Sequence, residues 1–135
     1  MHTVNVLNEV KPVRPDFAVL VGFEDQILSA LMAGADGSIC GPSNIAPALF
    51  VGLVRAFEAG DPAEAARLHR RALHLMAMYA LSDLSLGATK LAMTKLDVPI
   101  SSTVRGPALP VPPESEEAID AALEAAGLLP VHREA

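Results

Sequence analysis

Residues 19–44 read VLVGFEDQILSALMAGADGSICGPSN and hold two short apolar runs, each stopped by a glycine and followed by a helix-like segment. Apolar runs that alternate with amphipathic helices are typical of parallel strands joined by helical crossovers. We therefore expect two adjacent parallel strands, at residues 17–21 and 38–40, because a strand–helix–strand unit of this length makes a right-handed crossover. A parallel sheet needs both faces covered, and two strands do not form one alone.

Helix signals surround these strands. Gly34 stands where the first crossover helix should end, and Asn44 is a good N-cap for the next helix. Asp61 and Pro62 form a typical helix start. The predicted helices cover residues 1–11, where a strand stays possible, and residues 24–33, 45–60, 62–81, 83–97 and 114–129, with a proline-dense strap at 99–113.

The composition predicts one soluble domain. The chain has 135 residues, of which 51% are hydrophobic, so it can build a core. Its formal net charge of −6 disfavours nucleic acid and acidic membranes as partners, because both attract an excess of Lys and Arg. The N-terminal residues lack the pattern of a signal peptide, and no apolar run reaches the length of a membrane span. We expect a cytoplasmic protein.

The order of these elements carries a family resemblance. The chain contains VGFEDQ and GADGSICGPSN around the strands, AARLHRRALHL on the long helix, and PISSTVRGPALP in the strap. With these motifs it resembles the C-terminal part of the dihydrodipicolinate synthase and N-acetylneuraminate lyase family, in the 2-keto-3-deoxy sugar acid aldolase-like branch. The resemblance covers roughly residues 2–129.

The resemblance implies an α/β fold, namely the C-terminal portion of a (β/α)8 TIM barrel followed by a helical region. It assigns PDFAVLVG to the seventh strand and GSIC to the eighth. We expect residues 1–60 to form the last βα units of the barrel and residues 61–135 to form the C-terminal helical region. The first six strands have no counterpart in this sequence.

The same resemblance implies a chemistry without a cofactor. Family members join a pyruvate-like keto acid to a lysine as a Schiff base, assisted by a tyrosine and a threonine-rich loop. The lysine lies on the sixth strand and the other groups lie earlier. The lysines of this chain are Lys11, in the link before the first strand, and Lys90 and Lys95, on a predicted helix. A Schiff-base lysine needs a dry pocket that lowers its pKa, so we expect no catalytic residue here.

Candidate substrate-binding residues come from the strand ends, where barrels of this kind place their sites. By resemblance, the loop after the first strand contacts the distal, hydroxylated part of the substrate, and the end of the second strand lies beside the keto acid. The candidates are Gly22, Glu24, Asp25, Ile39, Cys40, Gly41 and Asn44.

Four of these residues also have a purely structural interpretation. Glu24 and Asp25 stand at a helix start, where the helix dipole and capping favour acidic side chains. Asn44 suits an N-cap. Cys40, the only cysteine, is equally a small hydrophobe on a buried strand, because a nucleophile needs a partner base and exposure.

The polar residues of the long helix do not predict a metal site. His69 and His74 are five residues apart, a spacing that does not place them on one face as a metal pair requires. We interpret both as solvated or interface side chains, and the adjacent Arg70 and Arg71 as a solvated face.

Two function hypotheses stay open. The first is the C-terminal part of a class I keto-acid aldolase or lyase, inactive alone. It would be a fragment, a truncated form, or one half of a split enzyme whose partner brings the lysine. The second is a non-enzymatic relic that self-associates. Both predict a homo-oligomer or a pairing with a complementary half-barrel, because half a barrel leaves strand edges and an apolar face uncovered. Helix 62–81 is the candidate contact surface, since its Leu68, Leu75, Met76 and Met78 exceed what one face needs.

Overall fold

The computed structural model describes residues 3–130, and its two strands are parallel, as predicted. β1 (Leu20–Val21) pairs with β2 (Gly37–Ser38), so that Leu20 lies opposite Gly37 and Val21 opposite Ser38. The Ile39 N–H continues the ladder by donating to the Val21 carbonyl at 2.9 Å. The crossover between the strands is the helical segment that the sequence predicts.

Both strands are shorter than residues 17–21 and 38–40, so those bounds were wrong. The register would place Phe17 and Ala18 opposite Gly34 and Ala35, but the Ala35 N–H already donates to the Ala30 carbonyl. The backbone opposite Phe17 and Ala18 therefore belongs to the end of a helix, and its N–H group is not free to pair with a strand. At the second strand, Cys40 stands directly before a 3₁₀ turn.

The N-terminal elements flank this small sheet. The first eleven residues contain a helix rather than a strand, α1 (Thr3–Val10), with Leu7 buried. The crossover consists of the 3₁₀ turn η1 (Glu24–Gln26) and α2 (Ile27–Met32), and it ends at Gly34, whose φ of 100° is in the left-handed region that favours glycine.

The next two helices pack side by side. η2 (Gly41–Asn44) leads into α3 (Pro47–Glu58), and α4 (Pro62–His74) follows. The prediction for α4 is confirmed, because Asp61 caps it by accepting from the Glu64 N–H at 2.9 Å. The N-cap prediction for Asn44 is wrong: Ala46 occupies that position, since Asn44 still belongs to the preceding 3₁₀ turn.

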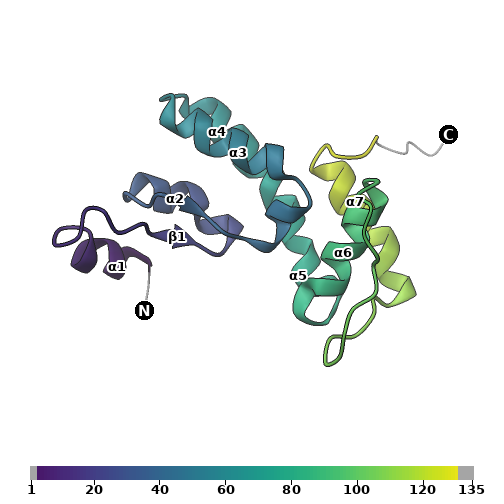
Figure 1. The fold of residues 1–135 in the computed structure, drawn as a ribbon. Helices are drawn as coiled ribbons and strands as arrows, with labels where there is room; N and C mark the ends of the chain where they lie inside the picture. The colour runs from purple at the N-terminus through teal and green to yellow at the C-terminus, as the bar shows by residue number, and fades with distance from the viewer. Residues whose placement is uncertain (1–2, 131–135) are drawn as a thin grey trace.

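The remaining helices gather at the other end of the molecule (Figure 1). The predicted helix 62–81 continues from α4 through the 3₁₀ turn η3 (Leu75–Ala77) into α5 (Met78–Leu81). The turn η4 (Asp83–Ser85) precedes α6 (Leu86–Lys95), so this helix starts later than residue 83 because Leu84 and Ser85 have positive φ. The strap then leads through η5 (Pro113–Ser115) to α7 (Glu116–Ala125).

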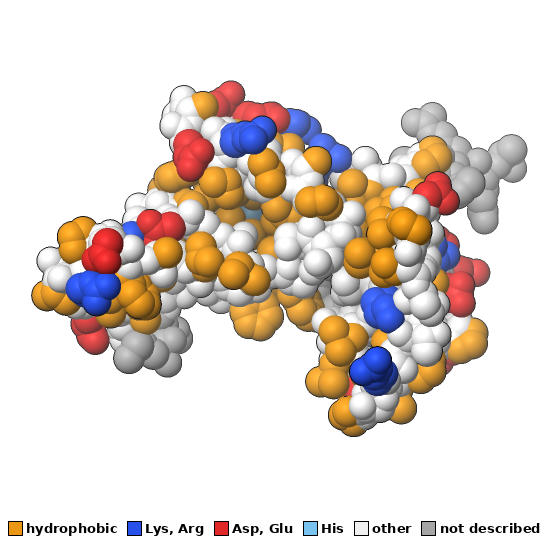
Figure 2. All heavy atoms as spheres, in the orientation of Figure 1, with side chains coloured by type: hydrophobic (Ala, Val, Ile, Leu, Met, Phe, Trp, Pro, Cys, Tyr) orange, Lys and Arg blue, Asp and Glu red, His pale blue; other side chains and the backbone are white. Residues whose placement is uncertain are grey.

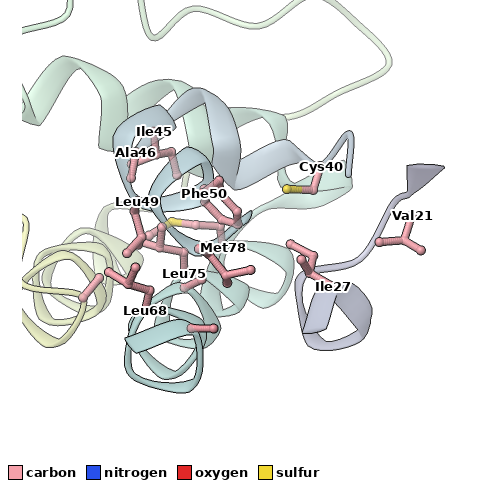
Figure 3. Close-up of a cluster of buried hydrophobic side chains, with 14 of the residues drawn as sticks. Val21, Ile27, Cys40, Ile45, Ala46, Leu49, Phe50, Leu68, Leu75 and Met78 are labelled. Atoms are coloured by element: carbon pink, nitrogen blue, oxygen red, sulfur yellow. The ribbon is translucent and has the colours of Figure 1, made fainter. Parts of the chain in front are cut away.

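The core joins the two ends. Side chains of α3, α4, η3 and α5 converge in one cluster, while Val21, Ile27 and Cys40 lie at its strand side (Figure 3). Leu75 and Met78 have no exposed surface and Leu68 has 8%. They belong to the chain's own core, so the prediction that the apolar side chains of helix 62–81 form a free contact surface is wrong for these three. No helix within residues 3–130 is long and apolar enough to cross a membrane.

Candidate functional site

The carboxyl ends of the two strands lie at one edge, because the strands are parallel. Gly22 follows β1, and Ile39, Cys40 and Gly41 follow β2. The loops are close together, since a Cβ placed on Gly22 would lie 4.0 Å from the Ile39 carbonyl oxygen. The structure therefore brings together the candidates from both strand ends, as expected of a barrel edge.

Glu24 is the most unusual side chain of this edge. It has no exposed surface, and its Oε1 accepts a hydrogen bond from the Tyr79 hydroxyl at 3.0 Å. Its Oε2 is buried and has no hydrogen-bond partner among the described residues. Glu24 and Asp25 lie in the first turn of η1, as the sequence predicts, and the Glu24 side chain makes its hydrogen bond with Tyr79 on α5.

The Glu24 backbone is bound as well. The His69 Nε2 lies 2.7 Å from the Glu24 carbonyl oxygen. Because a carbonyl oxygen only accepts, this ring nitrogen must carry the hydrogen. His69 is half-buried and is part of a defined contact between α4 and η1, rather than a side chain on a fully solvated face.

The Tyr79 ring closes this site from α5. Its centroid lies 5.8 Å from that of Phe23, and the two rings are tilted by 58°. Burial, and then the neighbouring Glu24 carboxylate, raises the pKa of Tyr79 to about 12. The hydroxyl therefore stays protonated and donates to Glu24 at neutral pH.

Cys40 lies in the same cluster as a buried thiol. Burial raises its pKa, and the Glu24 carboxylate adds to the effect. Its carbonyl accepts from the Ser43 Oγ at 2.6 Å. A raised pKa keeps the thiol protonated, so Cys40 has the properties of a small hydrophobe rather than those of a nucleophile.

The other candidates face outward. Asp25 and Asn44 are exposed, and Ile39 is 72% exposed. The Asn44 Nδ2 donates to the Gly41 carbonyl at 2.9 Å, so this side chain stiffens the η2 turn. Of the two adjacent acids, only Asp25 is presented to the surroundings.

The sequence did not reveal that His69 and Tyr79 belong to this edge. They lie 45 and 55 residues beyond Glu24, respectively. Their position depends on how α4 and α5 pack, and no local pattern signals it.

The lysines lie elsewhere and are engaged. Lys11 pairs with Asp36 at 2.7 Å and Lys95 with Asp120 at 2.8 Å, while the Lys90 ammonium donates to the Thr103 carbonyl. Asp36 also accepts from the Val19 N–H at 2.7 Å, and the Lys11 contact followed by this one lowers its pKa.

One face of the sheet is open. Leu20 lies opposite Gly37, and Ile39, two residues further on, points to the same side because side chains alternate along a strand. We call the exposed side chains of Leu20 and Ile39 the open face. Leu20 is 47% exposed, whereas Val21 on the other face is 3% exposed. Figure 2 shows hydrophobic side chains gathered on the surface between the two ends of the molecule.

A groove of about 510 Å³ runs between the sheet and α3. Leu20 and Gly37 line one wall and Phe50 and Val54 the other.

No group of three or more His, Cys, Asp or Glu side chains within residues 3–130 is arranged to hold a metal ion.

Two parallel strands joined by a helical crossover, with their carboxyl ends at one edge, have the arrangement of neighbouring strands in an α/β barrel. The chain belongs to the Dihydrodipicolinate synthetase family, whose profile matches residues 2–126. Its fold is the C-terminal portion of a (β/α)8 barrel, with the last two strands, plus the helical region that follows.

The relatives are aldolases and synthases. Over 130 residues the chain is 37% identical to the probable 2-dehydro-3-deoxy-D-pentonate aldolase YjhH of Escherichia coli, covering 96% of this chain. It is 34% identical over 110 residues to the putative 2-dehydro-3-deoxy-D-gluconate aldolase YagE of the same species, covering 82% of this chain.

Solved structures agree in fold. The crystal structure of YagE in complex with pyruvate matches 95% of this chain with a TM-score of 0.88 and 32% identity. The dihydrodipicolinate synthase of Thermotoga maritima matches 94% with a TM-score of 0.85 and 28% identity. The chain covers 43% of YjhH, 36% of YagE by sequence, and 43% and 42% of the two structures, so it spans about two-fifths of these relatives.

Proposed function

We propose that this chain is the C-terminal part of a class I pyruvate-dependent aldolase or lyase that acts on a 2-keto-3-deoxy sugar acid. The observation that carries this proposal is the match to YagE, a structure solved with pyruvate, over nearly the whole chain. The two first relatives have names that specify 2-dehydro-3-deoxy sugar acids, which supports the same substrate class.

The strand ends form one wall of the site in this proposal. Gly22, Glu24 and Asp25 belong to the loop on the side of the distal, hydroxylated part of the substrate, with Asn44 near its rim. Ile39, Cys40 and Gly41 lie beside the keto acid. The closeness of the two strand ends supports this arrangement.

The chain alone should have no turnover. Class I chemistry needs an imine that makes the keto acid an electron sink, and the imine needs a lysine with a lowered pKa. Lys11 and Lys95 are held in ion pairs and Lys90 by a carbonyl, all away from the strand ends.

An N-terminal half would complete the barrel. In this proposal, further strands and helices of the barrel pack against the open face and the groove beside α3. In this proposal residues 1–60 supply the last βα units, residues 61–135 form the helical extension, and the completed enzyme is cytoplasmic and uses no cofactor. Pairing between copies would cover the same face in a relic that self-associates without catalysis.

Pyruvate and borohydride test the proposal. The lone chain is incubated with both and its intact mass is measured; we expect no adduct, and a specific adduct on Lys11, Lys90 or Lys95 would contradict the missing-lysine argument. The chain is then mixed with the N-terminal part of YjhH that it does not match, and we expect an adduct on that part and cleavage of a 2-keto-3-deoxy sugar acid. The matched control is the same N-terminal part with its Schiff-base lysine replaced by alanine. No adduct and no cleavage after mixing would favour the relic.

A further inference from the structure

Glu24 is held from two sides by the helical region. Among residues 3–130 it is the one buried charged side chain. Its carboxylate accepts from Tyr79 on α5, and its carbonyl accepts from His69 on α4. Two contacts from separate helices thus converge on one residue of the strand-end loop.

Burial of this carboxylate is costly. A carboxylate that leaves water loses its hydration and needs hydrogen bonds in return. Glu24 accepts from the Tyr79 hydroxyl, and the weakly donating Cys40 thiol lies beside it, while its Oε2 has no hydrogen-bond partner among the described residues. A buried acid that is only partly compensated destabilises the fold, so its presence calls for a role other than stability.

The two adjacent acids face in different directions. In a 3₁₀ turn successive side chains are about 120° apart. Glu24 therefore points inward to Tyr79 while Asp25 is exposed. Glu24 has no exposed surface for a ligand, whereas Asp25 is exposed.

Tyr79 also reaches the second strand end. A Cβ placed on Gly41 would lie 3.6 Å from the Tyr79 hydroxyl. One side chain of α5 thus lies against the loop after β1 and the loop after β2. Tyr79 can therefore fix the distance between the two loops and the orientation of the loop after β1.

We propose that Glu24 is the anchor of loop 22–26 and Tyr79 the positioning residue that holds it, so that Asp25 is the acid of this pair that meets a hydroxylated ligand. The assignment of Asp25 rests on the proposed function, whereas the anchor is a property of the chain itself. The helical region then shapes the substrate end of the site without touching the substrate.

Carboxyl labelling of the lone chain tests the anchor. The chain is treated with a carbodiimide and glycine ethyl ester, and tandem mass spectrometry separates the adjacent acids. We expect Asp25 to react like the exposed Asp16, and Glu24 at least about tenfold more slowly. Tyr79→Phe keeps the ring against Phe23 but removes the donor. It should speed Glu24 labelling about tenfold or more, because a hydrogen bond to a charged group is worth at least that factor.

Tyrosinate absorbance provides an independent readout. Tyr79 is the only tyrosine and the chain has no tryptophan, so the signal reports one residue. Glu24→Gln keeps the shape and removes the charge, and it should lower the titration midpoint of Tyr79 toward its ordinary value. An unchanged midpoint in Glu24→Gln, with Glu24 labelled as fast as Asp25 in the unaltered chain, would overturn the anchor.

The completed enzyme tests the assignment of Asp25. With the N-terminal part of YjhH added, Asp25→Asn should raise the KM for a hydroxylated aldehyde about tenfold while leaving the pyruvate adduct with borohydride unchanged. Tyr79→Phe should raise the same KM by a smaller factor. A raised KM in Glu24→Gln with none in Asp25→Asn would overturn the assignment. Failure to form any active complex would contradict the proposed function, and the labelling result would still decide the anchor.

Discussion

The two sides of the sheet differ sharply. The side that meets the helices is closed: Val21, Ile27 and Leu53 have at most 3% exposure. The open face shows Leu20 at 47% and Ile39 at 72%. The closed side has its partners among the described residues, whereas the open face is left exposed by them; in the proposed function the rest of a barrel would cover it.

The largest expected effect separates the two sides by stability. Leu75→Ala removes a side chain with no exposed surface and should lower the free energy of unfolding by about 3 kcal/mol, from lost burial plus a cavity. Leu20→Ala on the open face should cost less than about 1 kcal/mol, because nearly half of that side chain is already in water. Urea unfolding midpoints measure both. Equal costs would show that the open face is covered in solution.

The second effect tests what covers the open face. Ile39→Lys should weaken self-association of the lone chain about tenfold or more. The substitution removes an apolar contact and places a lysine ammonium in the interface, and either change lowers the association constant by about that factor. Sedimentation equilibrium measures it. Met32→Lys is the matched control, since Met32 is 74% exposed on α2 and does not belong to the open face. A chain that is monomeric at all concentrations would contradict pairing through this face.

The third effect concerns the helical region, where Arg71 on α4 contacts the chain after α7. The Arg71 Nε donates to the Ala126 carbonyl at 2.8 Å and its Nη2 to the Gly127 carbonyl at 3.2 Å, so it binds free carbonyls after α7. The interpretation of Arg71 as solvated was therefore wrong. Arg71→Ala should destabilise by about 1 to 2 kcal/mol in thermal or urea unfolding. The exposed Arg70→Ala should change stability by no more than about 0.5 kcal/mol, and equal effects would refute the distinction.

The smallest effect appears only at high pH. The folded-state pKa of Tyr79, about 12, lies above the ordinary value near 10, so folding favours the protonated hydroxyl. Its contribution to stability is fully present below the unfolded pKa and is lost as the pH rises from about 10 to about 12. Tyr79→Phe should lack this part of the pH dependence, as urea midpoints across that window would show. Parallel curves for both proteins would contradict the raised pKa.

Local sequence patterns predicted much of the fold. The spacing of apolar residues and glycines indicated the strand–helix–strand unit, and Asp61 with Pro62 indicated the start of α4. These signals depend on neighbours in the chain, so they can be read without the tertiary structure. The bounds of the strands could not, because the end of α2 occupies the backbone that Phe17 would need. The assignment of residues 1–60 and 61–135 as two regions stays a prediction.

The sequence by itself determined that the chain is a parallel α/β piece with strand-end loops rich in glycine and acid. It also located Gly22, Asp25 and Gly41 at those ends, because a strand and its loop are contiguous. Only the tertiary structure decided that Glu24 turns inward, that His69 and Tyr79 hold it, and that Leu68, Leu75 and Met78 are core. These outcomes depend on which helix faces lie against η1 and α3. Such packing is set by many contacts distant in the sequence, so no local pattern contains it.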